Sequence, residues 1–137
     1  MQRAAFARVA DEVGFPADEM PPVQETIEDL RRLAEQGWRF WKATDGDAIV
    51  GTVRGIEQNG VVEIGRLAVA SAYVRRGVGT ALMRSLEQGF PDAVAFTLFT
   101  GHNAEAPLAL YDRLGYGHVG DEVLPNGYRL VWMEKRI

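Results

Sequence analysis

Two arginines and two glycines bring together residue types that can bind an anion. The run Arg75-Arg76-Gly77-Val78-Gly79-Thr80 follows a strand-like segment and opens into a helix-like one. Glycine has no Cβ, so the backbone at Gly77 and Gly79 can bend sharply and approach a ligand closely. The first N–H groups of the following helix have no partner within that helix and lie at the positive end of its dipole. We therefore predict that the loop cradles a diphosphate, with Arg75 and Arg76 adding charge at its rim.

The Gly-x-Gly pattern alone is also compatible with a tight turn that binds nothing. It is not the dinucleotide fingerprint, because Leu82 stands where the third glycine is required. It is not a phosphate-binding P-loop either, because no Gly-Lys-Ser/Thr sequence follows. The assignment of a ligand therefore depends on what surrounds the loop.

The surrounding residues resemble a known family. The sequence Leu67-Ala68-Val69, followed by Arg76-Gly77-Val78-Gly79-Thr80-Ala81-Leu82, is similar to the acyl-CoA-binding motif of the GNAT N-acetyltransferase superfamily. The downstream runs Phe99-Thr100-Gly101-His102-Asn103 and Leu110-Tyr111-Asp112-Arg113-Leu114-Gly115-Tyr116 resemble the family's second motif at its expected distance. Together the two motifs cover about half of the chain. The chain is identified as a small, bacterial-type member of this superfamily.

The resemblance implies which residues hold acetyl-CoA, the co-substrate. Main-chain groups of Leu67, Ala68 and Val69 would pair with the amides of the pantetheine arm, as an added strand pairs with a sheet. One N–H of this segment would lie near the thioester carbonyl and stabilise the charge that develops on its oxygen. The remaining cofactor candidates lie in the loop, in the first helical turn and after the second strand of the motif: Arg75, Arg76, Gly77, Val78, Gly79, Thr80 and Asn103.

Two side chains are candidates for proton transfer. Tyr111 matches the tyrosine of the second motif, and a phenol with a pKa of about 10 can protonate a departing thiolate. The alternative for Tyr111 is an aromatic ring packed on the buried face of a helix. Glu63 lies four residues before Leu67, like the base glutamate of histone-acetylating relatives, and strand alternation places it on the face of Leu67 and Val69. The alternative is a solvated strand residue, with a chain of waters as the base.

At three positions the sequence either departs from the family pattern or allows more than one role for the residue. The usual asparagine positions are occupied by Ala104 and Pro107, so Asn103 is a CoA contact, a turn residue or a helix cap. His102 is interpreted as a residue that structures the loop, with a catalytic base as the alternative. Val74 replaces the Gln or Arg with which the family's phosphate loop usually begins, which removes a side-chain contact and leaves the backbone amides.

Composition excludes several classes of protein. A chain of 137 residues with 47% hydrophobic and 25% charged residues matches one ordinary soluble domain. The net charge of -4 argues against a nucleic-acid binder that relies on its overall field. The absence of cysteine excludes disulfides and thiolate sites, and two histidines argue against a histidine-rich metal site. No apolar run reaches membrane-spanning length and no signal peptide opens the chain, so we expect a cytoplasmic protein. The frequent Ala, Gly and Arg residues indicate a bacterial source.

Periodicity and turn residues predict the elements that position these side chains. Helices are expected over Ala5–Val13, over Val23–Ala34 before Gly37, from Val78 to Gly89, and over Ala106–Leu114. Strands are expected over Trp38–Ala43, Ala48–Arg54, Val61–Val69, Ala93–Phe99, Gly117–Leu124 and Tyr128–Lys135. The segment Pro16–Pro22 is expected to be a connector.

These elements predict an α/β (α+β) fold in a single domain, residues 1–137. The sheet is mixed, mostly antiparallel and twisted, with about six strands, a central parallel pair and about four flanking helices. Relatives begin with a strand before the first helix, and the start of this chain resembles that helix, so we expect the family's first strand to be missing. An uncovered edge would favour pairing with a second chain, which makes a homodimer a hypothesis.

The leading functional hypothesis is transfer of an acetyl group from acetyl-CoA to a primary amine, on a small molecule or an exposed protein amine. A non-catalytic acyl-CoA-binding regulatory domain is the alternative, and a nucleotide-binding module is a third possibility. The acceptor would contact the first two helices and the two hairpins, where Arg54, Phe99 and Trp132 are candidates; Trp132 is as easily explained by ordinary packing. The sequence does not identify the amine.

Overall fold

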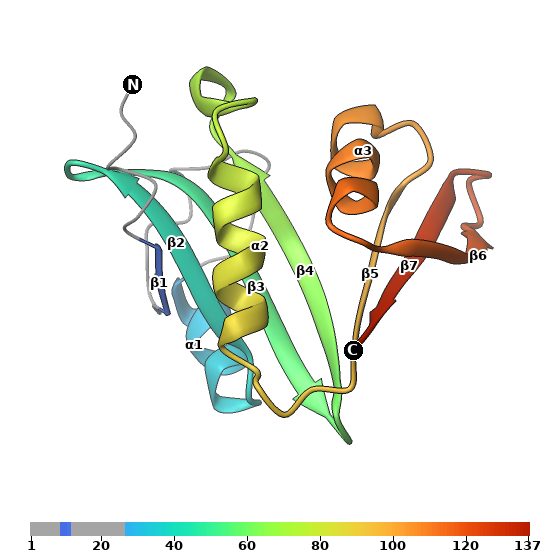
Figure 1. Cartoon of the computed structure of the whole chain (residues 1–137), viewed down its shortest axis with the longest axis horizontal. Helices are drawn as coiled ribbons and strands as arrows, with labels where there is room; N and C mark the ends of the chain where they lie inside the picture. Colours follow the sequence, from blue (N-terminus) through green and yellow to red (C-terminus); the bar gives the residue numbers. More distant parts are fainter. Residues whose placement is uncertain (1–8, 12–26) are drawn as a thin grey trace.

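A seven-stranded mixed sheet runs through the molecule, seen in Figure 1 in a computed structural model that describes residues 9–11 and 27–137. The strands lie in the order β1-β2-β3-β4-β5-β7-β6. They span Val9–Asp11 (β1), Arg39–Asp45 (β2), Ala48–Gln58 (β3), Val61–Val69 (β4), Ala95–Gly101 (β5), Gly117–Val123 (β6) and Arg129–Arg136 (β7). Within the described strands only β4 and β5 pair in parallel, so the prediction of a mostly antiparallel sheet with one central parallel pair is confirmed.

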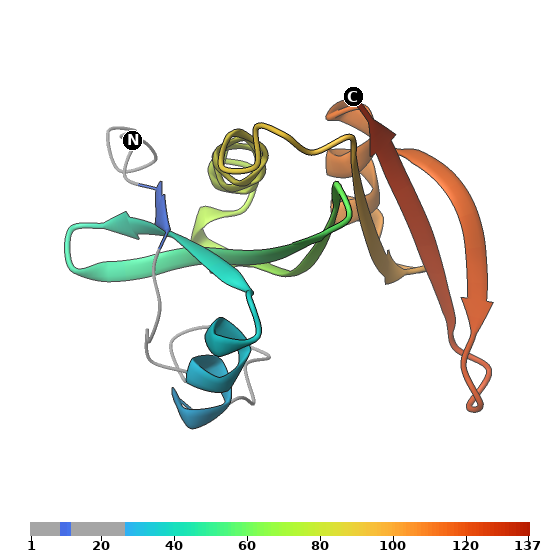
Figure 2. The same cartoon turned by 90° about the horizontal axis from the view of Figure 1, so that it is seen from below.

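Three α-helices and one short 3-10 turn cover the sheet within the described residues. They are α1 (Ile27–Glu35), η3 (Ser71–Tyr73), α2 (Val78–Gln88) and α3 (Glu105–Arg113). Figure 2 shows α1 below the sheet, with α2 and α3 above it. The predicted stops are confirmed, because Gly37 follows α1 with a φ of 111° and Gly89 is the C-cap of α2. None of the helices in these residues is long and apolar enough to span a bilayer.

The main core lies between the sheet and the pair α2 and α3. Val78, Leu82 and Leu86, the apolar stripe predicted for α2, are each at most 1% exposed. Tyr111 and Tyr116 join the same cluster from α3 and the residues after it. A smaller cluster of Leu30 and Phe40 lies under α1 on the other face. Burial of these apolar side chains is the main term that holds the two helices to the sheet.

The turns between strands follow the predicted chemistry. Gly46, in the β2–β3 hairpin, has a φ of 63°, and Asn59 and Gly60, in the β3–β4 hairpin, have φ values of 55° and 83°. Two consecutive left-handed residues are the signature of a tight hairpin turn whose twist matches that of the strands. The result is a β2–β3–β4 meander that delivers the chain to the parallel pair.

The prediction of a missing first strand is wrong. Val9–Asp11, expected inside an N-terminal helix, forms β1, which pairs antiparallel with β2 from Val9 opposite Ala43 to Asp11 opposite Trp41. Three-to-four spacing of apolar residues suggested a helix, and pairing with the free edge of β2 overrides that local preference. The edge on which the dimer hypothesis rested is therefore occupied. The rest of the predicted first helix, the connector and the start of the second helix lie outside the described residues.

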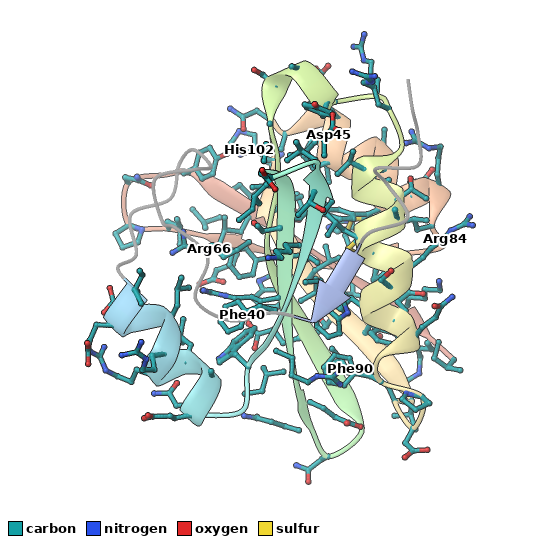
Figure 3. All side chains as sticks on the ribbon, turned by 90° about the vertical axis from the view of Figure 1, so that its left-hand side faces the viewer. Phe40, Asp45, Arg66, Arg84, Phe90 and His102 are labelled. Atoms are coloured by element: carbon teal, nitrogen blue, oxygen red, sulfur yellow. The ribbon has the colours of Figure 1, made fainter. Side chains whose placement is uncertain are left out.

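A β-bulge interrupts β4 and changes which side chains share a face. Across β3, Thr52 faces Ala68 and Arg54 faces Gly65, so β4 contains one extra residue. Arg66, inside this interval, has a φ of 59°, the left-handed conformation that a bulge can require. Figure 3 shows Arg66 on the α1 side of the sheet.

Candidate active site at the ends of β4 and β5

The parallel pair separates just before the predicted binding segment. The β4–β5 ladder runs from Val61 opposite Ala95 to Ile64 opposite Leu98 and stops there. Beyond it β4 stays paired with β3, where Ala68 faces Thr52 and Val69 faces Gly51. The side of β4 that faced β5 is therefore left without a strand partner from Gly65 to Val69. A peptide-like chain can pair with main-chain groups placed in this way.

The loop after β4 ends in a helix whose first amide groups are uncapped. Gly77 is the N-cap of α2, has a φ of 85°, and makes no side-chain cap hydrogen bond. The Ala81 N–H donates to the Gly77 carbonyl at 3.0 Å, which is the first bond of the helical ladder. The N–H groups of Val78, Gly79 and Thr80 precede that bond and have no acceptor within the helix. Such donors form an anion site together with the positive end of the helix dipole.

The two glycines of the loop have different roles. Gly77 supplies the left-handed turn, and a Cβ there would meet no atom within 4 Å. At Gly79 a Cβ would lie 3.0 Å from Leu110 Cδ2 and 3.9 Å from Val69 Cγ2. Gly79 therefore allows α2, α3 and β4 to pack closely, which corrects the prediction that both glycines serve the bend. Val78 is buried, so it offers only its main chain to a ligand.

The two arginines lie exposed beside this helix end, and Tyr73 organises the loop around them. The Arg76 guanidinium carbon lies 5.1 Å from the centre of the Tyr73 ring, a cation–π distance. The Tyr73 hydroxyl donates a hydrogen bond to Asp45, and this bond raises the pKa of Tyr73 above its usual value of 10.0. The contact ties the loop to the β2–β3 hairpin. This contact was not predicted, because it joins residues 28 positions apart.

Tyr111 lies on α3 in the main core and is only 6% exposed. Burial raises the pKa of its phenol to about 12, so the phenol is protonated at neutral pH. Its ring centre lies 6.1 Å from that of Tyr116, with the rings tilted by 59°. Among the described residues its hydroxyl makes no hydrogen bond. The hydroxyl oxygen is not fully enclosed by protein atoms, so it keeps contact with solvent. Tyr111 is thus a packed helix residue, as the alternative expected, with a protonated hydroxyl still available to a ligand.

A polar network beside Tyr111 was not anticipated from the sequence. The Tyr116 hydroxyl donates to Glu87 Oε2 at 2.6 Å, and Lys135 Nζ donates to Glu87 Oε1 at 2.9 Å. Burial and the bond to Glu87 raise the pKa of Tyr116. The network joins α2, β7 and the turn after α3. It therefore holds the ring against which Tyr111 packs.

Glu63 is half-buried on β4 and lies opposite Ile56 on β3 and Thr97 on β5. The prediction that it shares a face with Leu67 and Val69 is wrong. Leu67 and Val69 pack on the main core with α2, whereas Glu63 precedes the bulge and lies on the α1 side. The extra residue at the bulge reverses the alternation, which a count along the strand cannot detect. Glu63 and Tyr111 are therefore on opposite faces of the sheet.

The loop after β5 is tied to β7. His102 Nδ1 lies 2.9 Å from the Arg129 carbonyl oxygen, and its ring packs 4.8 Å from that of Tyr128. Asn103 Oδ1 accepts a 2.6 Å bond from the Tyr128 hydroxyl. The contacts of His102 agree with a residue that structures the loop. Asn103 does not cap α3 with its side chain, because the N-cap is Ala104 and no side-chain cap bond is made.

One cavity lies apart from this site. A cavity of ≈ 250 Å³ lies at the C-terminal end of α2, between Arg84, Glu87, Phe90 and Phe96. Within the described part of the chain, no group of three or more His, Asp or Glu side chains is arranged to hold a metal ion.

Comparisons with known proteins bear on this site. A family profile described as an acetyltransferase (GNAT) domain matches residues 15–137. N-acetyltransferase 8 of Rattus norvegicus is 29% identical over 103 residues, which is 67% of this chain and 45% of that protein. The chain thus spans a little under half the length of this curated relative.

Solved structures share the fold. An aminoglycoside 6'-N-acetyltransferase complexed with coenzyme A superposes with a TM-score of 0.71 at 23% identity, over 80% of this chain and 78% of that one. A GNAT family acetyltransferase from Elizabethkingia anophelis with acetyl-CoA bound gives a TM-score of 0.74 at 15% identity, over 94% and 97% of the two chains.

Proposed function

Because this chain belongs to the GNAT family of acetyltransferases, we propose that it transfers an acetyl group from acetyl-CoA to a primary amine within a ternary complex. The acceptor is a small molecule or an exposed protein amine. The observation that carries the proposal is the combination of two sets of free main-chain groups. One lies along β4 beyond Ile64 and the other at the start of α2, and both belong to one continuous stretch of chain.

These two sets match the two ends of a coenzyme A molecule. The uncapped N–H groups of Val78, Gly79 and Thr80, with Arg75 and Arg76 beside them, suit the diphosphate. The groups of Leu67, Ala68 and Val69 suit the pantetheine amides, which pair like an additional strand. Asn103 stays a further candidate, although its Oδ1 already accepts a bond from Tyr128. Acetyl-CoA bound in this way supplies an activated acetyl thioester near the end of β4.

The chain's own groups then lower the barrier for direct attack. Holding the amine beside the thioester replaces a bimolecular encounter, and a β4 N–H stabilises the negative charge that develops on the carbonyl oxygen. A bond forms between the amine nitrogen and the acetyl carbon while the carbon–sulfur bond breaks. Tyr111, protonated because burial raises its pKa to about 12, donates its proton to the departing thiolate.

The amine must also lose a proton, and Glu63 is the proposed acceptor. Its carboxylate makes no hydrogen bond or ion pair among the described residues and lies half-buried on the α1 face. Since Tyr111 is on the other face, the two groups would act from opposite sides of the place where β4 and β5 part. A water molecule between Glu63 and the amine would complete the transfer.

The opposite placement of Glu63 and Tyr111 is also the one observation that favours a second function, a non-catalytic acyl-CoA-binding regulatory domain. Calorimetry with acetyl-CoA, CoA and ATP, followed by thiol release across a panel of amines, separates the possibilities. The proposed enzyme binds acetyl-CoA and CoA but not ATP, and it releases CoA in an amine-dependent way. Binding without turnover for every amine would support the regulatory domain, and binding of ATP alone would reject both.

A further inference from the structure

Two aromatic rings lie side by side on the open face of the C-terminal half of the sheet. Phe99 on β5 and Trp132 on β7 are directly paired in the ladder, and their ring centres are 4.9 Å apart with a tilt of 49°. Phe99 is 45% exposed and points to the face opposite that of the buried Leu98, as strand alternation requires. On the other face of the sheet, α3 lies beside these strands (Figure 2).

The neighbouring strand leaves room over the rings. Gly120 on β6 lies opposite Trp132, and a Cβ there would meet no atom within 4 Å. The Trp132 indole N–H donates to Glu122 Oε1 at 3.2 Å, which holds the indole in place. The result is an apolar platform of two rings, in which Phe99 is exposed and Trp132 is half-buried.

Carboxylates lie at one end of this platform. Glu63, Thr97 and Glu134 form a row across β4, β5 and β7, and Thr97 precedes Phe99 by two positions on the same face. Two residues along a strand span about 6.6 Å. The row that contains Glu63 is therefore separated from the two aromatic rings by about the length of a short alkyl chain. Glu134 is paired with Arg136 at 3.2 Å, and Arg54, on the same face of β3, lies over the Trp38 ring. Arg66 is a second arginine on the α1 side of the sheet. Among the described residues, Glu63 makes no ion pair with either arginine, so its carboxylate can pair with the cation of a ligand.

We propose that the preferred acceptor is an arylalkyl amine without a carboxylate, whose ring packs on Phe99 and Trp132 while its ammonium group lies at Glu63. This inference rests on the proposed function and names its substrate class. An aromatic body gains ring–ring contact with the platform, and the cation gains an acidic partner. An amino acid of the same shape brings a carboxylate towards Glu63 and Glu134, which like-charge repulsion disfavours.

The test compares phenethylamine with phenylalanine, which differ only in the carboxylate, and with ethylamine, which lacks the ring. In wild-type protein kcat/KM should be highest for phenethylamine and at least about tenfold lower for phenylalanine. Trp132→Ala and Phe99→Ala should each raise KM for phenethylamine by about three- to tenfold, with little change for ethylamine. The control is Val123, an exposed apolar residue of the same hairpin that follows Glu122. Val123→Ala should leave kcat and KM for all three amines unchanged.

A purely structural role for the ring pair gives a different result. It would lower the melting temperature of both alanine variants and change kcat and KM equally for all three amines, which would overturn the proposal. Equal use of phenethylamine and phenylalanine by wild type would also overturn it. If a variant does not fold, Trp132→Leu and Phe99→Leu keep the apolar volume and test the loss of the ring alone.

Failure of the proposed function would be seen separately. If no amine is acetylated, calorimetric binding of phenethylamine and phenylalanine to the CoA-bound protein still tests the platform. Selective binding of phenethylamine that Trp132→Ala weakens supports the platform without catalysis. Equal binding, or no binding, of the two compounds rejects it.

Discussion

The Tyr116 hydroxyl donates a 2.6 Å hydrogen bond to Glu87, and the same carboxylate accepts a 2.9 Å bond from Lys135. Three elements that are distant in the chain therefore meet at one side chain of α2. Lys135 Nζ also lies 5.7 Å from the centre of the Tyr116 ring. Because Tyr116 packs against Tyr111, the network supports the candidate acid without touching the reactants.

Glu87→Leu should reduce the free energy of unfolding by about 2 kcal/mol, because it leaves the buried Tyr116 hydroxyl and the Lys135 ammonium without their acceptor. Urea denaturation measures the change. Glu57→Leu, at an exposed position of β3, is the matched control and should stay within about 0.5 kcal/mol of wild type. Equal effects of the two substitutions would mean that the network contributes no stability.

Tyr111→Phe should lower kcat by about 100-fold or more, the usual contribution of a positioned acid, while leaving unfolding free energy and acetyl-CoA affinity almost unchanged. The free energy of unfolding should not change because the Tyr111 hydroxyl makes no hydrogen bond among the described residues. Tyr116→Phe should show the reverse, a loss of about 1 to 2 kcal/mol from the bond to Glu87 with a small effect on kcat. If Tyr111→Phe keeps full activity in steady-state thiol release, Tyr111 is a core residue and not the acid.

Much of this arrangement was predictable, because it depends on local chemistry. The Asp45-Gly46 and Asn59-Gly60 turns, the buried stripe of α2 and the parallel pairing of β4 with β5 all follow from residue type and spacing. Each of these features is encoded within a few neighbouring residues, so a reading of the sequence along the chain can find it.

Features that depend on tertiary contacts were missed. The bulge at Arg66 is marked only by the neighbouring Gly65, which does not show where the extra residue falls, so the reversal of the face on which Glu63 lies was not predicted. At Gly101 a Cβ would overlap the Tyr128 hydroxyl, so the glycine lets the residue before β7 pack against the end of β5. The edge strand Val9–Asp11 is likewise fixed by its partner β2 more than by its own residues.

Stability should fall as the pH rises from about 10 towards 12, and Tyr111 accounts for part of this. Burial raises its pKa from the ordinary value of 10.0 to about 12 in the folded protein, so in this range the unfolded chain loses a proton that the folded chain keeps. The unfolded state then binds fewer protons, and each such group costs about 1.4 kcal/mol per pH unit. Chemical denaturation between pH 8 and 11.5 should show a shallower fall for Tyr111→Phe than for wild type. Parallel curves would mean that burial does not shift this phenol.

Gly77→Ala should weaken acetyl-CoA binding by at least about tenfold and cost about 1 kcal/mol of stability, because alanine is strained at a φ of 85° and relief of the strain turns the first α2 amides away. Gly37→Ala is the matched control. Gly37 has a φ of 111°, and a Cβ there would meet only Ile56 side-chain atoms, at 3.6 and 3.8 Å, so it carries similar strain after α1, away from the loop before α2. Calorimetry should find unchanged affinity in Gly37→Ala despite a similar loss of stability. If both variants bind acetyl-CoA equally well, the diphosphate does not depend on the left-handed turn before α2.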